Sequence, residues 1–225
     1  MLHKNHYIYQ YLRGIAAGLA IGLAGAAALA ASATIENAAV ALLVRSLIFP
    51  VGLILIVFCG YSLFTGCVAT CAELPWKEYG KTLGVVYAGN LLGTIIAASL
   101  ASFRASPQML ALARTIAETK CGLDVFALAA LAFGCNLLIG IGVLNAKKYK
   151  TALSRITILF IVVFLFMICN MEHSIANMFF LLFGKLYAGA KISISAILYN
   201  LITVTIFNFL GGATSVYYEI FSGET

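Results

Sequence analysis

The chain has 225 residues, of which 63% are hydrophobic and only 10% are charged, and its formal net charge is +6. An ordinary soluble domain is about 25% charged, so these charged residues are too few to cover a surface that faces water. The composition excludes an ordinary soluble domain. A positive charge on so apolar a chain indicates anionic lipid or an anionic permeant as partner, not nucleic acid.

Six long apolar stretches follow one another along the chain. A helix rises about 1.5 Å per residue and the hydrocarbon core of a bilayer is about 30 Å thick, so each stretch is long enough to cross a membrane. Polar joints separate them. The predicted transmembrane helices lie near residues 12–33, 46–71, 82–102, 122–145, 156–183 and 194–218.

An even number of spans places both termini on the same side of the membrane. Of the 14 Lys and Arg residues, more fall on the termini side than on the opposite side, and the densest group is Lys147 to Lys150. Basic residues in short loops favour the cytoplasm. We therefore expect a multi-pass protein of the cytoplasmic (inner) membrane with both termini in the cytoplasm.

The second half of the chain repeats features of the first. The string Asn90-Leu91-Leu92-Gly93 recurs as Asn208-Phe209-Leu210-Gly211, and Cys59 and Cys169 each precede a polar interruption in an apolar span. Because each half has three spans, an odd number, the halves must insert with opposite orientations, as in inverted-repeat transporters. We predict a single transmembrane domain over residues 1–225, with repeats at approximately 12–103 and 121–218.

The polar interruptions fall deep inside the second and fifth spans, at residues 60–66 and 170–177. Irregular backbone at that depth is tolerated only where it is buried in protein or lines a cavity. Two such breaks in corresponding halves indicate a site near the bilayer midplane. The N-termini of the half-helices there would direct backbone N–H groups towards an anion.

Glu172 and His173 are an adjacent ionisable pair in the middle of the fifth span. Such residues are costly in hydrocarbon and usually face a cavity or a partner. A carboxylate beside an anion path would repel the permeant, so we expect Glu172 to anchor the loop by accepting backbone N–H bonds. For His173 two interpretations stay open, a group beside the path and an inert ring held between helices.

Several strings resemble the signatures of the formate/nitrite transporter family. The run from Cys169 to Phe179, which contains Glu-His-Ser-Ile-Ala-Asn-Met, is similar to the family's fifth-span signature, and the run from Cys59 to Thr65 is similar to its omega loop. Further matches are Gly89 to Gly93, Cys135 to Leu137 and Asn208 to Gly212. The resemblance implies an all-α, aquaporin-like fold of six helices with the second and fifth broken, assembled as a homopentamer with one pore in each protomer.

The resemblance also implies roles for individual residues. It places His173, Thr65, Lys120, Asn136 and Asn177 along the substrate pathway, with Thr65 hydrogen-bonded to His173 and Lys120 in a vestibule. Apolar constrictions fall at Phe49, Leu53, Leu63, Phe64 and Phe166. Glu172, Asn90 and Asn208 fall at positions that shape the loops. The family's basic residue at the start of the first span corresponds to Tyr9, with Arg13 or His6 as stand-ins.

These expectations lead to a hypothesis of weak-acid transport. A bare anion is expensive to move through an apolar slit, whereas its conjugate acid is neutral and far cheaper to desolvate. Histidine suits this task because its ordinary pKa, about 6.5, lies in the physiological range. The predicted permeants are formate or nitrite together with protons. Alternatives are hydrosulfide, then lactate, acetate and other short carboxylates, and last a neutral pore for ammonia or water.

The sequence does not favour an enzyme. Cys59, Cys169 and His173 lack a second base or an orienting carboxylate at suitable spacing. Cys67 and Cys71 are four residues apart, but no His or carboxylate joins them at the spacing of a metal site. We therefore expect no catalytic residue, no bound metal and no cofactor.

Overall fold

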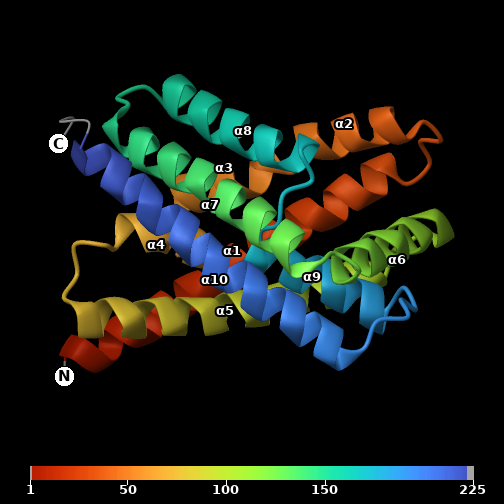
Figure 1. Cartoon of the computed structure of the whole chain (residues 1–225), viewed down its shortest axis with the longest axis horizontal. Helices are drawn as coiled ribbons and strands as arrows, with labels where there is room; N and C mark the ends of the chain where they lie inside the picture. Colours follow the sequence, from red (N-terminus) through yellow and green to blue (C-terminus); the bar gives the residue numbers. More distant parts are fainter. Residues whose placement is uncertain (1, 222–225) are drawn as a thin grey trace.

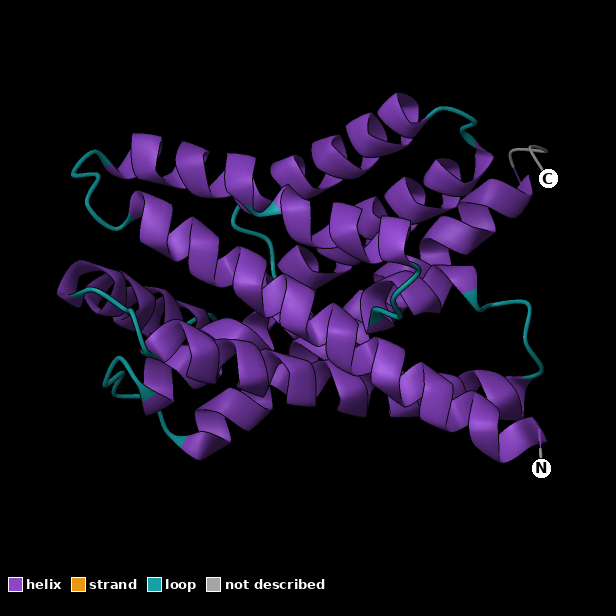
Figure 2. Ribbon diagram, turned by 180° about the vertical axis from the view of Figure 1, so that it is seen from behind, coloured by secondary structure: helices purple, strands orange, loops and turns teal. Residues whose placement is uncertain are grey.

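The computed structural model describes the backbone of residues 2–221, with side chains placed for residues 6–219. Within residues 2–221 the chain forms ten helices joined by short loops and has no strand (Figures 1 and 2). The helices are α1 (Leu2–Ser32), α2 (Ala38–Ile48), α3 (Pro50–Cys59), α4 (Phe64–Thr70), α5 (Trp76–Ser102), α6 (Pro107–Cys121), α7 (Val125–Lys148), α8 (Ala152–Ile168), α9 (Ser174–Leu186) and α10 (Ile194–Phe221).

Within the described residues, five helical segments are long and apolar enough to cross a membrane, namely His6–Ser32, Ala38–Cys59, Trp76–Ser102, Val125–Lys148 and Ile194–Glu219. The remaining predicted span is divided between the shorter apolar helices α8 and α9. In Figure 1 the start of α1 and the end of α10 lie at one end of the molecule, together with the α4–α5 and α7–α8 loops. The predicted order of six spans, with the second and fifth broken, is confirmed.

Some predicted boundaries are wrong. The second span begins at Ala38 rather than near residue 46, because the Asn37 side chain caps the helix by accepting bonds from the N–H groups of residues 39 and 40. The third begins at Trp76 rather than near residue 82, directly after Pro75. Its first turns carry lysines that the sequence analysis assigned to a joint, and such residues suit the interface between lipid and water.

The stretch 103–120, which the sequence analysis read as a polar joint, contains the 15-residue helix α6. Ser106 caps this helix through a bond from the N–H of Met109, and Pro107 occupies its first turn. Met109, Ala113 and Ala117 are buried, and α6 packs against α9. Gly122, the predicted start of the fourth span, instead ends α6, and α7 starts after the cap at Asp124.

The two halves use the same close packing of paired helices. Helix α1 packs along α5, and α7 packs along α10. A Cβ added to Gly93 of α5 would overlap the carbonyl oxygen of Ile15, and one added to Gly211 of α10 would overlap that of Phe133. Each glycine therefore lets two backbones touch, as small residues do between membrane helices. The α1–α5 pair and the α7–α10 pair are therefore packed in the same way.

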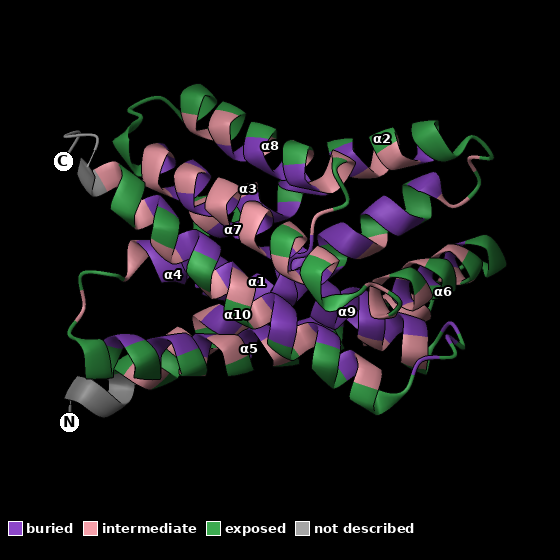
Figure 3. Ribbon diagram, in the orientation of Figure 1, coloured by how far each residue is buried: buried purple, intermediate pink, exposed green. Residues whose placement is uncertain are grey.

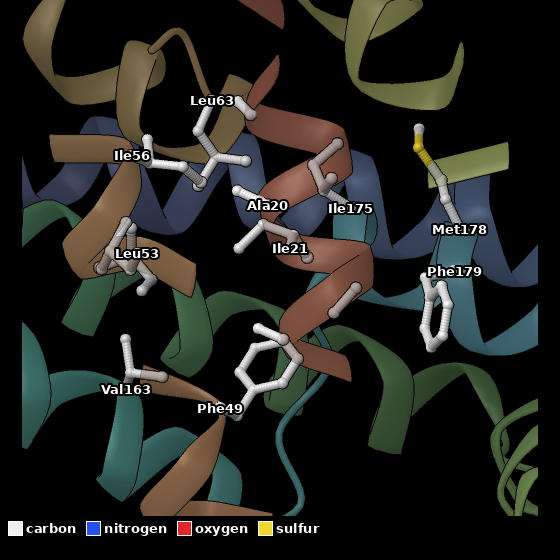
Figure 4. Packing of buried hydrophobic residues seen from close by; sticks show 14 of the residues in the cluster. Ala20, Ile21, Phe49, Leu53, Ile56, Leu63, Val163, Ile175, Met178 and Phe179 are labelled. Carbon is white, nitrogen blue, oxygen red and sulfur yellow. The ribbon is translucent and has the colours of Figure 1, made fainter. Parts of the chain in front are cut away.

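The protein interior is centred on α9, of which ten of the thirteen residues are buried. Figure 3 shows buried residues gathered between the helices and exposed residues along the outer faces. Figure 4 shows apolar side chains of three helices in one cluster, with Ile21 of α1 lying between Leu53 and Ile56 of α3 and Phe179 of α9. Helix α9 therefore lies in the core and places the second break there.

Candidate functional site

The two helix breaks are built in the same way. Gly60 ends α3 in the left-handed conformation (φ 67°), and Asn170 follows α8 in the same region (φ 49°). Gly and Asn adopt this conformation most readily. In both breaks the next N–H, that of Tyr61 or Met171, donates to a carbonyl five residues earlier at 2.9 Å. The chain then runs extended for a few residues before a new helix begins.

Asn90 and Asn208 hold these breaks in place. The Asn90 Oδ1 accepts the N–H of Phe64 at 2.8 Å, and its Nδ2 donates to the carbonyls of Gly14 and Ser62. In the other half, the Asn208 Oδ1 accepts the N–H of Ser174 at 2.8 Å, and its Nδ2 donates to the carbonyls of Ala132 and Glu172. Both side chains are fully buried. Each amide thus pairs two backbone groups that a helix break would otherwise leave unpaired, and its third bond ties the break to a neighbouring helix, α1 or α7.

His173 is the last residue before α9 and is 2% exposed. Its Nδ1 accepts the N–H of Ala176 at 3.1 Å, and its Nε2 lies 2.9 Å from the Thr65 Oγ1. Because Nδ1 accepts, the neutral ring carries its hydrogen on Nε2 and donates it to Thr65. The ring stacks on Phe166, with centroids 5.7 Å apart. His173 is therefore held as a neutral imidazole by both of its nitrogen atoms.

Four of the five predicted constriction residues either pack near this ring or line a cavity on the termini side of the molecule. Phe49 and Phe166 are buried and meet edge to face, with centroids 6.0 Å apart. Leu53 and Leu63 are buried and line the cavity on the termini side. Phe64 differs, because its ring packs edge to face on Tyr87, at 5.0 Å, and lines neither of the two cavities described below.

Glu172 does not bind as the sequence analysis expected. Its carboxylate accepts bonds from two side chains, the Lys120 Nζ at 2.8 Å and the Asn177 Nδ2, instead of from backbone N–H groups. Asn177 also donates to Asn200, and Asn200 donates to the carbonyl of Lys120 at 2.9 Å. The four side chains form a connected cluster, so Lys120 is an ion-paired group here rather than a free cation. Asn200, a polar residue within an apolar span, went unnoticed in the sequence.

Asn136 is hydrogen-bonded to two backbone carbonyls in the protein interior. Its Nδ2 donates to the carbonyl of Asn208 at 2.7 Å and to that of Thr65 at 3.2 Å. It is fully buried and lines neither cavity. The residue therefore ties α4 to α10 and orients Thr65.

Two cavities flank the buried ring from opposite ends of the molecule. The termini-side cavity, of about 320 Å³, has three basic lining residues, Arg13, Lys147 and Arg155. The opposite cavity, of about 420 Å³, is lined by Arg45, Lys120 and Glu172. His173 lines neither cavity. Of these basic residues, only Lys120 and Arg13 were predicted from the sequence to have a role in the site, because the others lie at the ends of apolar stretches like ordinary interface residues.

Comparisons with known proteins identify the family of this chain. A sequence model of the family described as formate/nitrite transporter matches residues 3–219. The chain belongs to the formate/nitrite transporter family. Among curated relatives, a formate-nitrite transporter of Entamoeba histolytica is 34% identical over 177 residues, covering 72% of this chain and 48% of that protein. This chain therefore spans about half the length of that relative.

A second relative, described as a probable formate transporter of Methanothermobacter thermautotrophicus, is 31% identical over 77% of this chain and 72% of its own length. Among solved structures, a pentameric formate channel with formate bound superposes with a TM-score of 0.84 at 27% identity, covering 97% of this chain and 99% of that one. The predicted family and the predicted aquaporin-like, all-helical membrane fold are confirmed.

Proposed function

We propose that this chain is a channel or transporter of the cytoplasmic membrane for small monovalent anions of weak acids, of the formate and nitrite class, and that transport is coupled to protons. The observation that carries the proposal is the neutral His173 ring, hydrogen-bonded to Thr65 and enclosed between two cavities that both contain basic residues. The likeness to formate channels and transporters supports the same substrate class.

Basic residues on each side concentrate the anion in a cavity. The anion then meets the apolar side chains of Phe49, Leu53, Leu63 and Phe166, which a charged species crosses only at high cost. Protonation turns the permeant into a neutral acid that passes this region far more cheaply. Transport of the acid moves one proton with each anion, and the flux follows both gradients.

In this proposal His173 contributes hydrogen bonds between the two cavities. Its Nδ1 accepts the Ala176 N–H, so its only hydrogen is on Nε2. Giving up that hydrogen would leave an anionic ring in an apolar site, which is unfavourable. The proton therefore comes from water in the cavity. The imidazole fixes Thr65 as an acceptor, which leaves the Thr65 hydroxyl hydrogen free for the permeant.

The test is formate flux into proteoliposomes containing His173→Asn. We expect the flux to fall at least about tenfold, the loss that removal of a strong buried hydrogen bond produces. Gln108→Asn, at an exposed residue of α6 that lines neither cavity, is the control and should retain wild-type flux. Wild-type flux should rise as the pH falls, because the fraction of neutral acid rises. Undiminished flux in His173→Asn with an unchanged pH profile would remove His173 from the mechanism.

Substrate selectivity follows from an anion panel in the same vesicles. We expect formate and nitrite to cross fastest and lactate to cross slowest, because a larger acid must displace more of the packed apolar side chains. Hydrosulfide and acetate belong in the same panel. Ammonia flux that is insensitive to Lys120→Glu, in the absence of any anion flux, would identify a neutral-solute pore instead.

We also propose that the chain assembles as a homopentamer with both termini in the cytoplasm. The likeness to a pentameric formate channel supports the assembly. Native mass spectrometry of the detergent-solubilised protein should give a mass of five chains, and a monomer as the sole species would contradict it. Protease protection of a tag at either terminus in sealed cells tests the orientation.

A further inference from the structure

The termini-side cavity carries more positive charge than a monovalent permeant needs. Arg13 of α1, Lys147 of α7 and Arg155 of α8 all line it, and none of its lining residues is acidic. In the opposite cavity, Lys120 is paired with Glu172, which leaves Arg45 as the uncompensated charge. One bound formate would balance the second cavity but would leave most of the charge in the first unbalanced.

The two arginines of the termini-side cavity are positioned by aromatic rings. The Arg13 guanidinium lies 5.2 Å from the centroid of the Tyr9 ring, and the Arg155 guanidinium lies 4.8 Å from that of Phe58. Stacking on a ring holds a guanidinium in place while its N–H donors stay available in its plane. The two ion pairs found among the described residues, Lys120–Glu172 and Lys148–Glu219, use neither arginine.

A further observation points to an acceptor that belongs at this site. The Nε of Arg155 is buried and has no hydrogen-bond partner. Buried donors are almost always paired with protein, water or a bound group. Three like charges around one cavity also repel each other. A ligand with several negative charges would accept a bond from the Arg155 Nε and would offset this repulsion.

We propose that the termini-side cavity binds a soluble multivalent oxyanion of the phosphate type, and that the bound anion blocks transport. A cavity of about 320 Å³ accepts such an anion. One proton does not neutralise a multivalent anion, so the anion does not cross the apolar region beyond Leu53 and Leu63. It stays in the cavity and excludes the permeant, so that the pathway is closed from the side on which the anion is present.

Binding is tested by calorimetry of the purified protein in a zwitterionic detergent, with inorganic pyrophosphate as the probe and the ionic strength held constant. We expect saturable binding of one pyrophosphate per chain. Lys147→Gln and Arg155→Gln should each weaken it about tenfold, as loss of a charge-assisted hydrogen bond does. Lys150→Gln, a nearby exposed lysine outside the cavity, should leave it unchanged. Absence of saturable binding, or equal weakening by Lys150→Gln, would overturn the proposal.

The block is tested by formate flux in phosphatidylcholine vesicles with pyrophosphate on both sides. We expect inhibition that Lys147→Gln and Arg155→Gln relieve, and that chloride at the same ionic strength does not reproduce. Flux that is unaffected at saturating pyrophosphate would overturn the block. Adding phosphatidylglycerol should leave the inhibition intact, and its loss would assign the site to a lipid headgroup and overturn a soluble ligand. This arm rests on the proposed function, whereas the calorimetry decides on the site even if formate does not cross.

Discussion

The first and second helix breaks share a hydrogen-bonding framework but differ in the chemistry they carry. Asn90 and Asn208 make three equivalent bonds each, and Gly60 and Asn170 turn the chain in the same way. At the first break, however, Ser62 donates to the neutral Gln10 at 2.7 Å, whereas at the second Glu172 forms an ion pair with Lys120. The residue that follows is Leu63 in one break and His173 in the other.

This comparison separates the residues that make the fold from those that make the site. Whatever both halves retain holds a broken helix in a membrane, where every backbone polar group needs a partner inside the protein. A side-chain interaction that is found at only one break is not needed to hold a broken helix, and it can therefore have a role in transport. Three features lack a counterpart at the first break: the imidazole of His173, the Lys120–Glu172 ion pair and the amide of Asn136. The imidazole and the Asn136 amide both bond to Thr65.

The framework is tested most severely by Asn208→Leu. The change leaves the N–H of Ser174 and the carbonyl of Glu172 without partners and removes the bond that ties the break to the Ala132 carbonyl of α7. We expect a loss of about 3–5 kcal/mol or failure to fold, since each unpaired buried group costs about 1–3 kcal/mol. Asn90→Leu should cost a similar amount if the halves are equivalent. Asn37→Ala, which removes a helix cap, should cost only about 1 kcal/mol. Thermal unfolding in detergent measures all three, and a mild effect at Asn208 would break the comparison.

The Lys120–Glu172 ion pair is the largest difference in charge between the two breaks. Two substitutions replace it with the neutral Gln and Ser side chains that bond to each other at the first break. Glu172→Ser alone leaves Lys120 without its partner, and we expect a loss of about 3 kcal/mol. Adding Lys120→Gln should recover part of this loss, because no charge is then stranded. A double-mutant cycle on unfolding midpoints gives the coupling. Additive effects of the two substitutions would show that the pair contributes nothing as a unit.

The matched glycines test the packing of the two halves. Gly93→Ala and Gly211→Ala each press a methyl group on a carbonyl of the neighbouring helix, Ile15 or Phe133. We expect each to lower the free energy of unfolding by about 1–3 kcal/mol. Gly80→Ala, with no atom within 4 Å of the added Cβ, is the control and should be neutral or stabilise α5 by up to about 1 kcal/mol. Unequal effects at the two sites would mean that the halves are not packed alike.

The fold was predictable because its signals are local. A short run of sequence is enough to recognise each apolar stretch, each polar interruption and the string that begins with Asn90 and recurs at Asn208. Helix α6 was missed because it is short and only one side of it is buried, so its composition is that of a joint. The boundary at Ala38 was missed because it depends on a single capping side chain, that of Asn37.

The site was predictable only in part, because its contacts join distant segments. The resemblance placed Thr65 beside His173 across 108 residues. Nothing in the sequence indicated that Lys120 pairs with Glu172, 52 residues away, and this pairing changes the charge of one cavity. Arg45, Lys147 and Arg155 enter the cavities only because helices from both halves meet there. The sequence indicates that charge is present, whereas the packing decides which charges remain uncompensated.

The central claim is that the His173 imidazole of the second break, which the first break lacks, is required for rapid transport of the anion. The direct measurement is formate uptake by His173→Leu, which gives the second break the side chain found at Leu63, compared with wild type at two pH values in the same vesicles. We predict that uptake falls at least about tenfold at both. Wild-type uptake with the same pH dependence would contradict the claim.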